Sequence, residues 1–179
     1  MRAAAFAALA AVLLSAAPSL AEAPPEPDGY RIENVRSPTP ATLRGAQVLD
    51  VIDAAHLWKE GSAAFVDVMP RPPRPALPAG TVWRDPPRMS IPGAIWLPNT
   101  GFGALNPEAE SYFARGLANA GKGDPARPVV FFCERDCWMS WNAAKRALAL
   151  GHPRVMWFPD GTNGWTEAGL PLERVEPLP

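Results

Sequence analysis

The sequence predicts an α/β fold, an open parallel sheet of about five strands with helices on both faces. From about Ala46 onward, short apolar stretches alternate with segments of helical pattern. This alternation is typical of a parallel sheet whose strands are joined by helices. The stretch 129–132 is apolar at every position, as expected of a central strand that is covered on both faces.

The length and the charge of the chain limit the number of domains and the kinds of partner that we expect. The chain has 179 residues, with 17 basic and 18 acidic side chains. This length fits one core of ordinary size, so we expect a single domain over residues 46–175. Because the charges are balanced and form no basic runs, no long-range field attracts nucleic acid. We therefore expect no nucleic-acid partner.

Residues 1–21 have the pattern of a secretory signal peptide. Arg2 precedes an uncharged run of 15 residues, 3–17, and small residues follow up to Ala21. The run is short for a bilayer span, which needs ~20 apolar residues. We expect cleavage near Ala21, a periplasmic protein, and no stable membrane insertion after cleavage.

The first half of the exported chain is predicted to contain an arm, an excursion, three strands and a helix. Residues 22–45 contain five prolines and few apolar residues, which favours an extended arm over packed structure. Residues 70–92 contain eight prolines, which exclude a helix or a central strand and indicate an excursion from the domain. We expect strands at 46–49, 64–68 and 94–97, and a helix at 53–60 with Asp50 or Asp53 as N-cap and Gly61 just past its end.

The second half is predicted to contain two more strands and two helices. Asn106 and Pro107 form a helix start, a cap followed by a first-turn proline, and the helix continues to residue 120. A helix over 140–150 is stopped by Gly151. The strands are expected at 129–132 and 155–158, and turns follow from residue 160.

Cys133 directly follows the apolar stretch 129–132. In open α/β sheets the functional crevice lies beyond the carboxyl ends of the strands. A thiol there faces unpaired backbone N–H groups and the positive end of the next helix, and both lower its pKa. From the residues alone two interpretations stay open: an activated thiol, which we favour, and a buried structural cysteine.

Four sequence motifs stand out in the predicted domain: Asp67 at a strand end, Ile91-Pro92-Gly93-Ala94, the cysteine loop, and Gly164-Trp165 with Gly169-Leu170-Pro171. Together they resemble the rhodanese domain. The loop from Cys133 to Trp138 reads Cys-x-x-x-Cys-Trp and resembles, more narrowly, an exported rhodanese-like family with that motif. That family is associated with PQQ-dependent alcohol catabolism.

The resemblance implies a rhodanese-like fold and a sulfur-carrying role for Cys133. It implies a small sulfur or thiol substrate, and a quinoprotein dehydrogenase or its electron-acceptor protein as partner. We expect no cofactor, PQQ included, because the chain lacks the internal repetition of the propeller dehydrogenases that hold it.

The loop also departs from the rhodanese pattern. It has no glycine, carries Glu134 and Asp136, and by its expected helix start is about two residues longer. Negative charge beside the cysteine raises the energy of the thiolate and repels thiosulfate. This argues against ordinary thiosulfate sulfurtransferase activity.

Cys137 lies four positions after Cys133, a spacing that allows a disulfide across the loop. Three roles stay open for the pair: redox or sulfur chemistry with one thiolate attacking and the other resolving, a static disulfide, and a cysteine-bound metal. Metal ranks last because only two soft ligands are local and His56 and His152 have no ligand spacing to them, so no metal ligand is assigned. If the disulfide is static, we expect a non-catalytic docking module that uses its proline-rich segment to bind a quinoprotein dehydrogenase or its cytochrome.

Five further residues are candidates for the site. Arg135 could pair with an anionic substrate or with Asp136, and Trp138 is either a lid over the cysteines or a core residue. With Ser140 at the expected helix start, these are the candidate substrate-binding residues. Asp67 and Asp136 are candidate supporting residues, Asp67 as a group that orients the loop or as a solvated acid.

Overall fold

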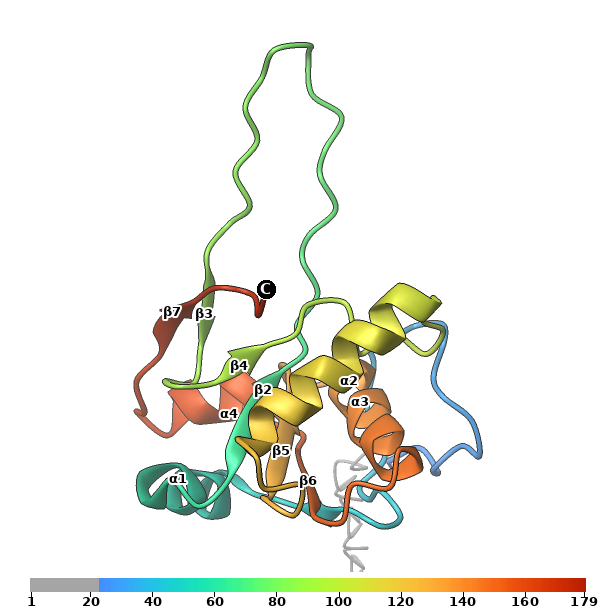
Figure 1. The fold of residues 1–179 in the computed structure, drawn as a ribbon, viewed down its shortest axis with the longest axis vertical. Coiled ribbons are helices and arrows are strands. Elements are labelled where there is room, and N and C mark those ends of the chain that lie inside the picture. Colours follow the sequence, from blue (N-terminus) through green and yellow to red (C-terminus); the bar gives the residue numbers. More distant parts are fainter. Residues whose placement is uncertain (1–22) are drawn as a thin grey trace, which may run out of the picture.

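The sheet has five parallel strands in the order β1-β6-β5-β2-β4 (Figure 1). A computed structural model describes residues 23–179, and the expected signal peptide lies outside them. The expected fold class is confirmed. The strands are β1 (Gln47–Val48), β2 (Ala64–Asp67), β4 (Ile95–Trp96), β5 (Val129–Phe132) and β6 (Val155–Phe158).

Helices cover both faces of the sheet (Figure 1). Alternate residues of the central strands point to opposite faces. Phe131 of β5 stacks on Phe113 of α2, with ring centroids 5.8 Å apart. Phe65 of β2 packs against Trp165 of α4 on the other face. The helices are α1 (Val51–Glu60), α2 (Pro107–Gly121), α3 (Trp138–Ala149) and α4 (Gly161–Glu167).

Local signals at the helix ends act largely as expected. Asp50 caps α1 by accepting a hydrogen bond from the amide of Asp53, and Gly61 ends that helix with a positive φ of 62°. Asn106 caps α2. The expected start of α3 at Ser140 is wrong, because the helix begins two residues earlier, at Trp138. The loop between Cys133 and this helix is therefore the segment 134–137.

A second, two-stranded antiparallel sheet was not anticipated. It pairs β3 (Arg88–Ser90) with β7 (Glu173–Val175). β3 lies near the end of the proline-rich excursion, in the proline-free stretch 88–91. Between residues 70 and 87 the chain has no helix or strand and projects from the domain as a long open loop (Figure 1).

The N-terminal arm carries no helix, yet it packs on the domain. Leu43 belongs to the main core and is 3% exposed. The side chain of Asn142 in α3 bonds the backbone of Arg31 in both directions, accepting from its N–H at 2.9 Å and donating to its carbonyl at 2.8 Å. The arm is thus extended, as expected, but not unpacked. Within residues 23–179, no helix has the length and apolar character needed to span a membrane.

Candidate active site

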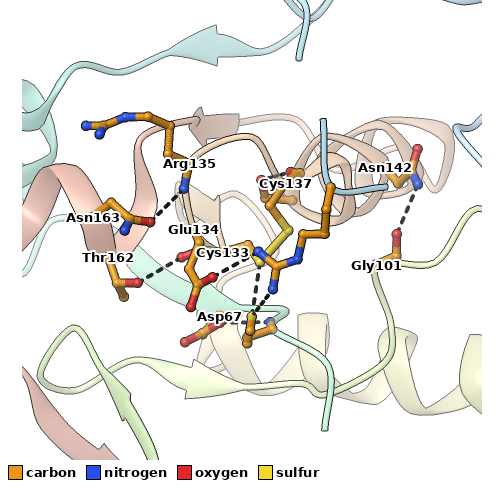
Figure 2. Close-up of a disulfide and its surroundings, with 12 residues drawn as sticks. Asp67, Gly101, Cys133, Glu134, Arg135, Cys137, Asn142, Thr162 and Asn163 are labelled. Atoms are coloured by element: carbon orange, nitrogen blue, oxygen red, sulfur yellow. Dashed lines mark hydrogen bonds and ion pairs between the residues drawn. A yellow bond between two sulfur atoms is a disulfide. The ribbon is translucent and has the colours of Figure 1, made fainter. Parts of the chain in front are cut away.

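Cys133 and Cys137 form a disulfide at the carboxyl end of the central strand β5 (Figure 2). Cys133 follows the last residue of β5, and Cys137 is the residue just before α3. Their α-carbons are 6.3 Å apart, within the range that a disulfide requires. Their exposed fractions are only 0% and 1%. The structure thus brings together the two predicted cysteines, in an oxidised and buried state.

Backbone hydrogen bonds fix the cysteine loop against the start of α4. The carbonyl of Cys133 accepts from the amide of Thr162 at 3.1 Å, and the amide of Arg135 donates to the side chain of Asn163 at 3.0 Å. Gly161 lies so close to the carbonyl of Cys133 that a Cβ there would clash with it. The turn expected from residue 160 is instead the start of α4, and glycine at the first position of this helix allows its close approach to the loop.

Asp136 adopts a left-handed backbone conformation, with φ at 55°. This conformation costs most residues energy and is easiest for glycine. The side chain is exposed. Asp136 thus shapes the loop through its backbone.

A chain of charged side chains joins the end of β2 to the cysteine loop. Asp67 is fully buried and accepts from Arg88 Nε at 2.7 Å and from Ser90 Oγ at 2.6 Å. Another nitrogen of Arg88 lies 3.4 Å from Glu134, and Arg36 of the arm binds Glu134 at 2.9 Å. Burial raises the pKa of Asp67, while Arg88 opposes this shift. Asp67 therefore supports the loop through Arg88 and is not a solvated acid.

This chain also changes the electrostatics expected at the cysteines. Glu134 pairs with two arginines, Arg36 and Arg88. Its negative charge is therefore balanced within the site, by two arginines that the sequence analysis did not identify. The repulsion of an anionic sulfur species by Glu134 is weaker than the loop sequence alone predicts.

Arg135 is directed away from the cysteine pair (Figure 2). Its guanidinium binds Asp160 at 2.9 Å and Glu167 at 2.6 Å. The hydrogen bonds to Glu167 are the main cause of the raised pKa of Arg135. The side chain thus ties the loop to α4; it pairs neither with Asp136 nor with a position next to the sulfur atoms.

Trp138 and Ser140 are both buried in the protein interior. The indole N–H of Trp138 lies within hydrogen-bonding distance of Ser37 Oγ and of the carbonyl of Pro38, at 3.1 and 3.0 Å. The hydroxyl of Ser140 donates to the carbonyl of Cys137 and accepts from the indole of Trp157. Trp138 holds the arm, and Ser140 holds the end of the cysteine loop.

The arm crosses directly over the cysteine loop. The carbonyl of Val35 accepts from the amide of Trp138 at 2.9 Å, and Arg36 pairs with Cys137 in an isolated antiparallel bridge. Two amides at the start of α3 and in the loop, those of Trp138 and Arg135, are thus already bonded within the protein. An anion bound at this helix start would have to compete with these contacts.

Met69 is a site residue that the sequence analysis missed. Its Sδ lies 3.5 Å from Cys133 Sγ and 3.1 Å from Arg36 Nη2. The indole of Trp96 donates to its carbonyl at 2.7 Å, and its amide donates to Asp67 at 2.8 Å. The available signal was its position two residues after a strand-ending acid, since the ends of neighbouring parallel strands meet at one edge of the sheet. In residues 23–179 no three His, Cys, Asp or Glu side chains are grouped to hold a metal ion.

Comparison with known proteins places this site in a family. Residues 50–168 match the family model described as a rhodanese-like domain. The chain belongs to the rhodanese-like family. No match is found among curated proteins.

The chain is also similar to several solved structures, at low sequence identity. A thiosulfate sulfurtransferase from Pseudomonas aeruginosa is 21% identical, with a TM-score of 0.48, over 75% of this chain and 21% of that chain. The polysulfide-sulfur transferase homodimer from Wolinella succinogenes is 20% identical, with a TM-score of 0.47, over 72% of this chain and 79% of that one. The complex of EanB/Y353A with ergothioneine is 20% identical, with a TM-score of 0.50, over 80% of this chain and 34% of that chain. This chain therefore spans only a small part of the first and the last of these proteins.

Proposed function

We propose that Cys133 and Cys137 release sulfide from a sulfane sulfur compound, with Cys133 as acceptor and Cys137 as resolving thiol. The observation that carries the proposal is their disulfide at the end of β5, at the carboxyl edge of the parallel sheet. In open α/β sheets this edge is the functional one. The disulfide is then the oxidised state that forms when sulfide is released.

The cycle balances with a dithiol as reductant. In the reduced protein the Cys133 thiolate attacks the outer sulfur of a persulfide, R–S–SH, takes it as Cys133–S–SH and releases the thiolate R–S⁻. The Cys137 thiolate then attacks Cys133 Sγ, forms the disulfide and expels hydrosulfide. A dithiol reduces the disulfide by exchange, becomes a disulfide itself and restores both thiols.

A persulfide suits the site better than thiosulfate does. The amides of Arg135 and Trp138 are already bonded to Asn163 and Val35, so they do not form an open cradle for a sulfonate group. Met69 and the disulfide make the surroundings of Cys133 rich in sulfur. A substrate with a single charge and a polarisable sulfur needs less anion binding than thiosulfate, which carries two charges.

We place this activity in the periplasm, as an accessory step of PQQ-dependent alcohol oxidation. The support is the Cys-x-x-x-Cys-Trp motif at 133–138 and the signal-like residues 1–21. There the protein would remove reactive persulfide sulfur close to a quinoprotein dehydrogenase or its electron acceptor. Growth on an alcohol as carbon source, with the gene deleted or carrying Cys133→Ser, tests this part separately.

Trapping of the intermediate tests the chemistry. Reduced protein is freed of reductant and given one equivalent of glutathione persulfide, and sulfide and intact mass are measured. The wild type should release one sulfide per chain and close its disulfide. Cys137→Ser should keep one added sulfur atom and release none, and Cys133→Ser should gain no sulfur. If sulfide release by the wild type does not exceed that of Cys133→Ser, the proposal is wrong.

Burial of the disulfide favours a second candidate, a docking module with a static disulfide. Both sulfur-bearing residues are enclosed by the arm and the sheet, and residues 71–82 are exposed at every position. In this case the disulfide should resist a dithiol reductant until the protein unfolds. Alkylation of native protein after treatment with dithiothreitol separates the candidates: two modified thiols support the redox site, and none supports the docking module.

A further inference from the structure

Three sulfur atoms from three segments converge below the N-terminal arm. Cys133 ends the central strand, Cys137 precedes α3, and Met69 follows the neighbouring strand β2. Met69 Sδ is 3.5 Å from Cys133 Sγ, and Cys133 Sγ is bonded to Cys137 Sγ. The proposed sulfide chemistry uses two of these atoms and leaves the thioether of Met69 without a role.

The spacing of these atoms suits a soft metal ion once the disulfide is reduced. Three sulfurs in a plane around a metal, with bonds of ~2.3 Å, lie about 4 Å from one another. The sulfur atoms of Met69 and Cys133 are already near this separation. Reduction breaks the bond between the two cysteine sulfurs, so that they can move apart to the same separation. A thioether has two lone pairs; one accepts from Arg36 at 3.1 Å, which leaves the other for a metal.

Charge and burial also favour such a site. Two thiolates and one thioether around a monovalent ion carry a net charge of −1. The guanidinium of Arg36 lies against Met69 Sδ and binds Glu134. Both cysteines are shielded from water, which protects a reduced metal from oxidation. The arm thus places a guanidinium next to the thioether and covers the site.

We propose that the reduced protein binds one Cu(I) ion through Cys133, Cys137 and Met69. Thiolate and thioether ligands select Cu(I). Zn²⁺ prefers four ligands in a tetrahedron, and in the described part of the chain no cluster of His, Cys, Asp or Glu completes one. A dithiol reductant first opens the disulfide; Cu(I) then replaces the two thiol protons, which are released, and its oxidation state does not change.

This inference shares with the proposed function only the need for a reducible disulfide. The test therefore begins with protein purified from the periplasm, which is reduced, freed of reductant without oxygen, and shown by alkylation to carry two free thiols. Cu(I) is then titrated in competition with bicinchoninate. We expect one Cu(I) per chain, and metal-loaded protein should resist alkylation at Cys133 and Cys137. Sulfide release is measured on a metal-free aliquot, so the proposed sulfide chemistry and the proposed Cu(I) binding can each fail independently of the other.

Substitution of the thioether gives the decisive comparison. Met69→Leu keeps the shape of the side chain and removes its sulfur, so Cu(I) affinity should fall about tenfold or more. Met89→Leu is the matched control, since Met89 is an exposed residue of β3, and its affinity should equal that of the wild type. Both variants are checked for two reducible thiols before titration. Equal affinity in Met69→Leu and wild type, no Cu(I) retention by protein with two free thiols, or equally tight Zn²⁺ binding would each overturn the inference.

Discussion

Arg88 Nε donates a hydrogen bond of 2.7 Å to the buried carboxylate of Asp67. This bond joins the end of β2 to the first residue of β3 and, through the contact of Arg88 with Glu134, to the cysteine loop. The small second sheet therefore has a function in the site: it delivers the counter-ion that a buried carboxylate needs. The conformation of the cysteine loop depends on a residue 45 positions before Cys133 in the sequence.

Arg88→Met should strongly destabilise the protein. Arg88 is 11% exposed and Asp67 is 0% exposed, so the substitution leaves a buried charge without a partner. We expect the free energy of unfolding to fall by about 3 kcal/mol or more. Urea unfolding measures it, and Arg74→Met, an exposed arginine of the excursion, serves as the control.

The stability that Arg88→Met loses should also depend on pH. Burial raises the pKa of Asp67, and removal of Arg88 raises it further. A raised pKa in the folded state means that the stability is present at acid pH and is lost as the pH rises through that pKa. Arg88→Met should therefore be closest to the wild type at the lowest pH, and Asp67→Asn in the Arg88→Met background should remove the pH dependence. A deficit that is constant across pH would show that the carboxylate is not its cause.

The elements could be predicted because their signals are local. The apolar strands 129–132 and 155–158 have the bounds expected from sequence, and Asp50 and Gly61 fix the ends of α1. The start of α3 could not be predicted, since Cys137 caps the helix without a side-chain hydrogen bond. The arm completes that helix start from a distance, through the carbonyl of Val35.

The cysteine pair could be predicted, but most of its surroundings could not. Arg36, Met69 and Arg88 reach the loop from 97, 64 and 45 positions before Cys133, and no periodic pattern marks them. Arg135, by contrast, is adjacent in sequence and directed elsewhere, because Asp160 and Glu167 of the α4 region attract it. Partners of a loop residue depend on topology, which sequence spacing does not encode.

Asp136→Gly should stabilise the cysteine loop. Asp136 has a φ of 55°, where a Cβ costs roughly 1–2 kcal/mol relative to glycine. Asp136→Ala removes the same charge and keeps the Cβ, so it is the matched control. We expect the glycine variant to exceed the alanine variant by about 1 kcal/mol in the free energy of unfolding. Equal stabilities would show that the backbone strain is relieved by other means.

Asn142→Ala should loosen the arm without unfolding the sheet. The Asn142 side chain makes three hydrogen bonds, two to the backbone of Arg31 and one to the carbonyl of Gly101. Their loss costs about 1 kcal/mol each. Trypsin, which cleaves after arginine, should cut at Arg31 and Arg36 faster in this variant. Asn119→Ala, on an exposed position of α2, should be cut at the wild-type rate; a similar acceleration in both variants would contradict this anchoring role.

Removal of the disulfide should cost a modest amount of stability. The ring closed by Cys133 and Cys137 spans a sequence separation of four, and closure of so short a loop restricts the unfolded chain by only about 2 kcal/mol. The Cys133→Ala/Cys137→Ala variant should lose this amount in urea unfolding and become insensitive to dithiothreitol. Wild-type protein in dithiothreitol should approach the stability of that variant while still folded, because sulfide release and Cu(I) binding both require a folded dithiol state. A wild type that stays fully oxidised in reductant until it unfolds would contradict both uses of the pair and leave the docking module.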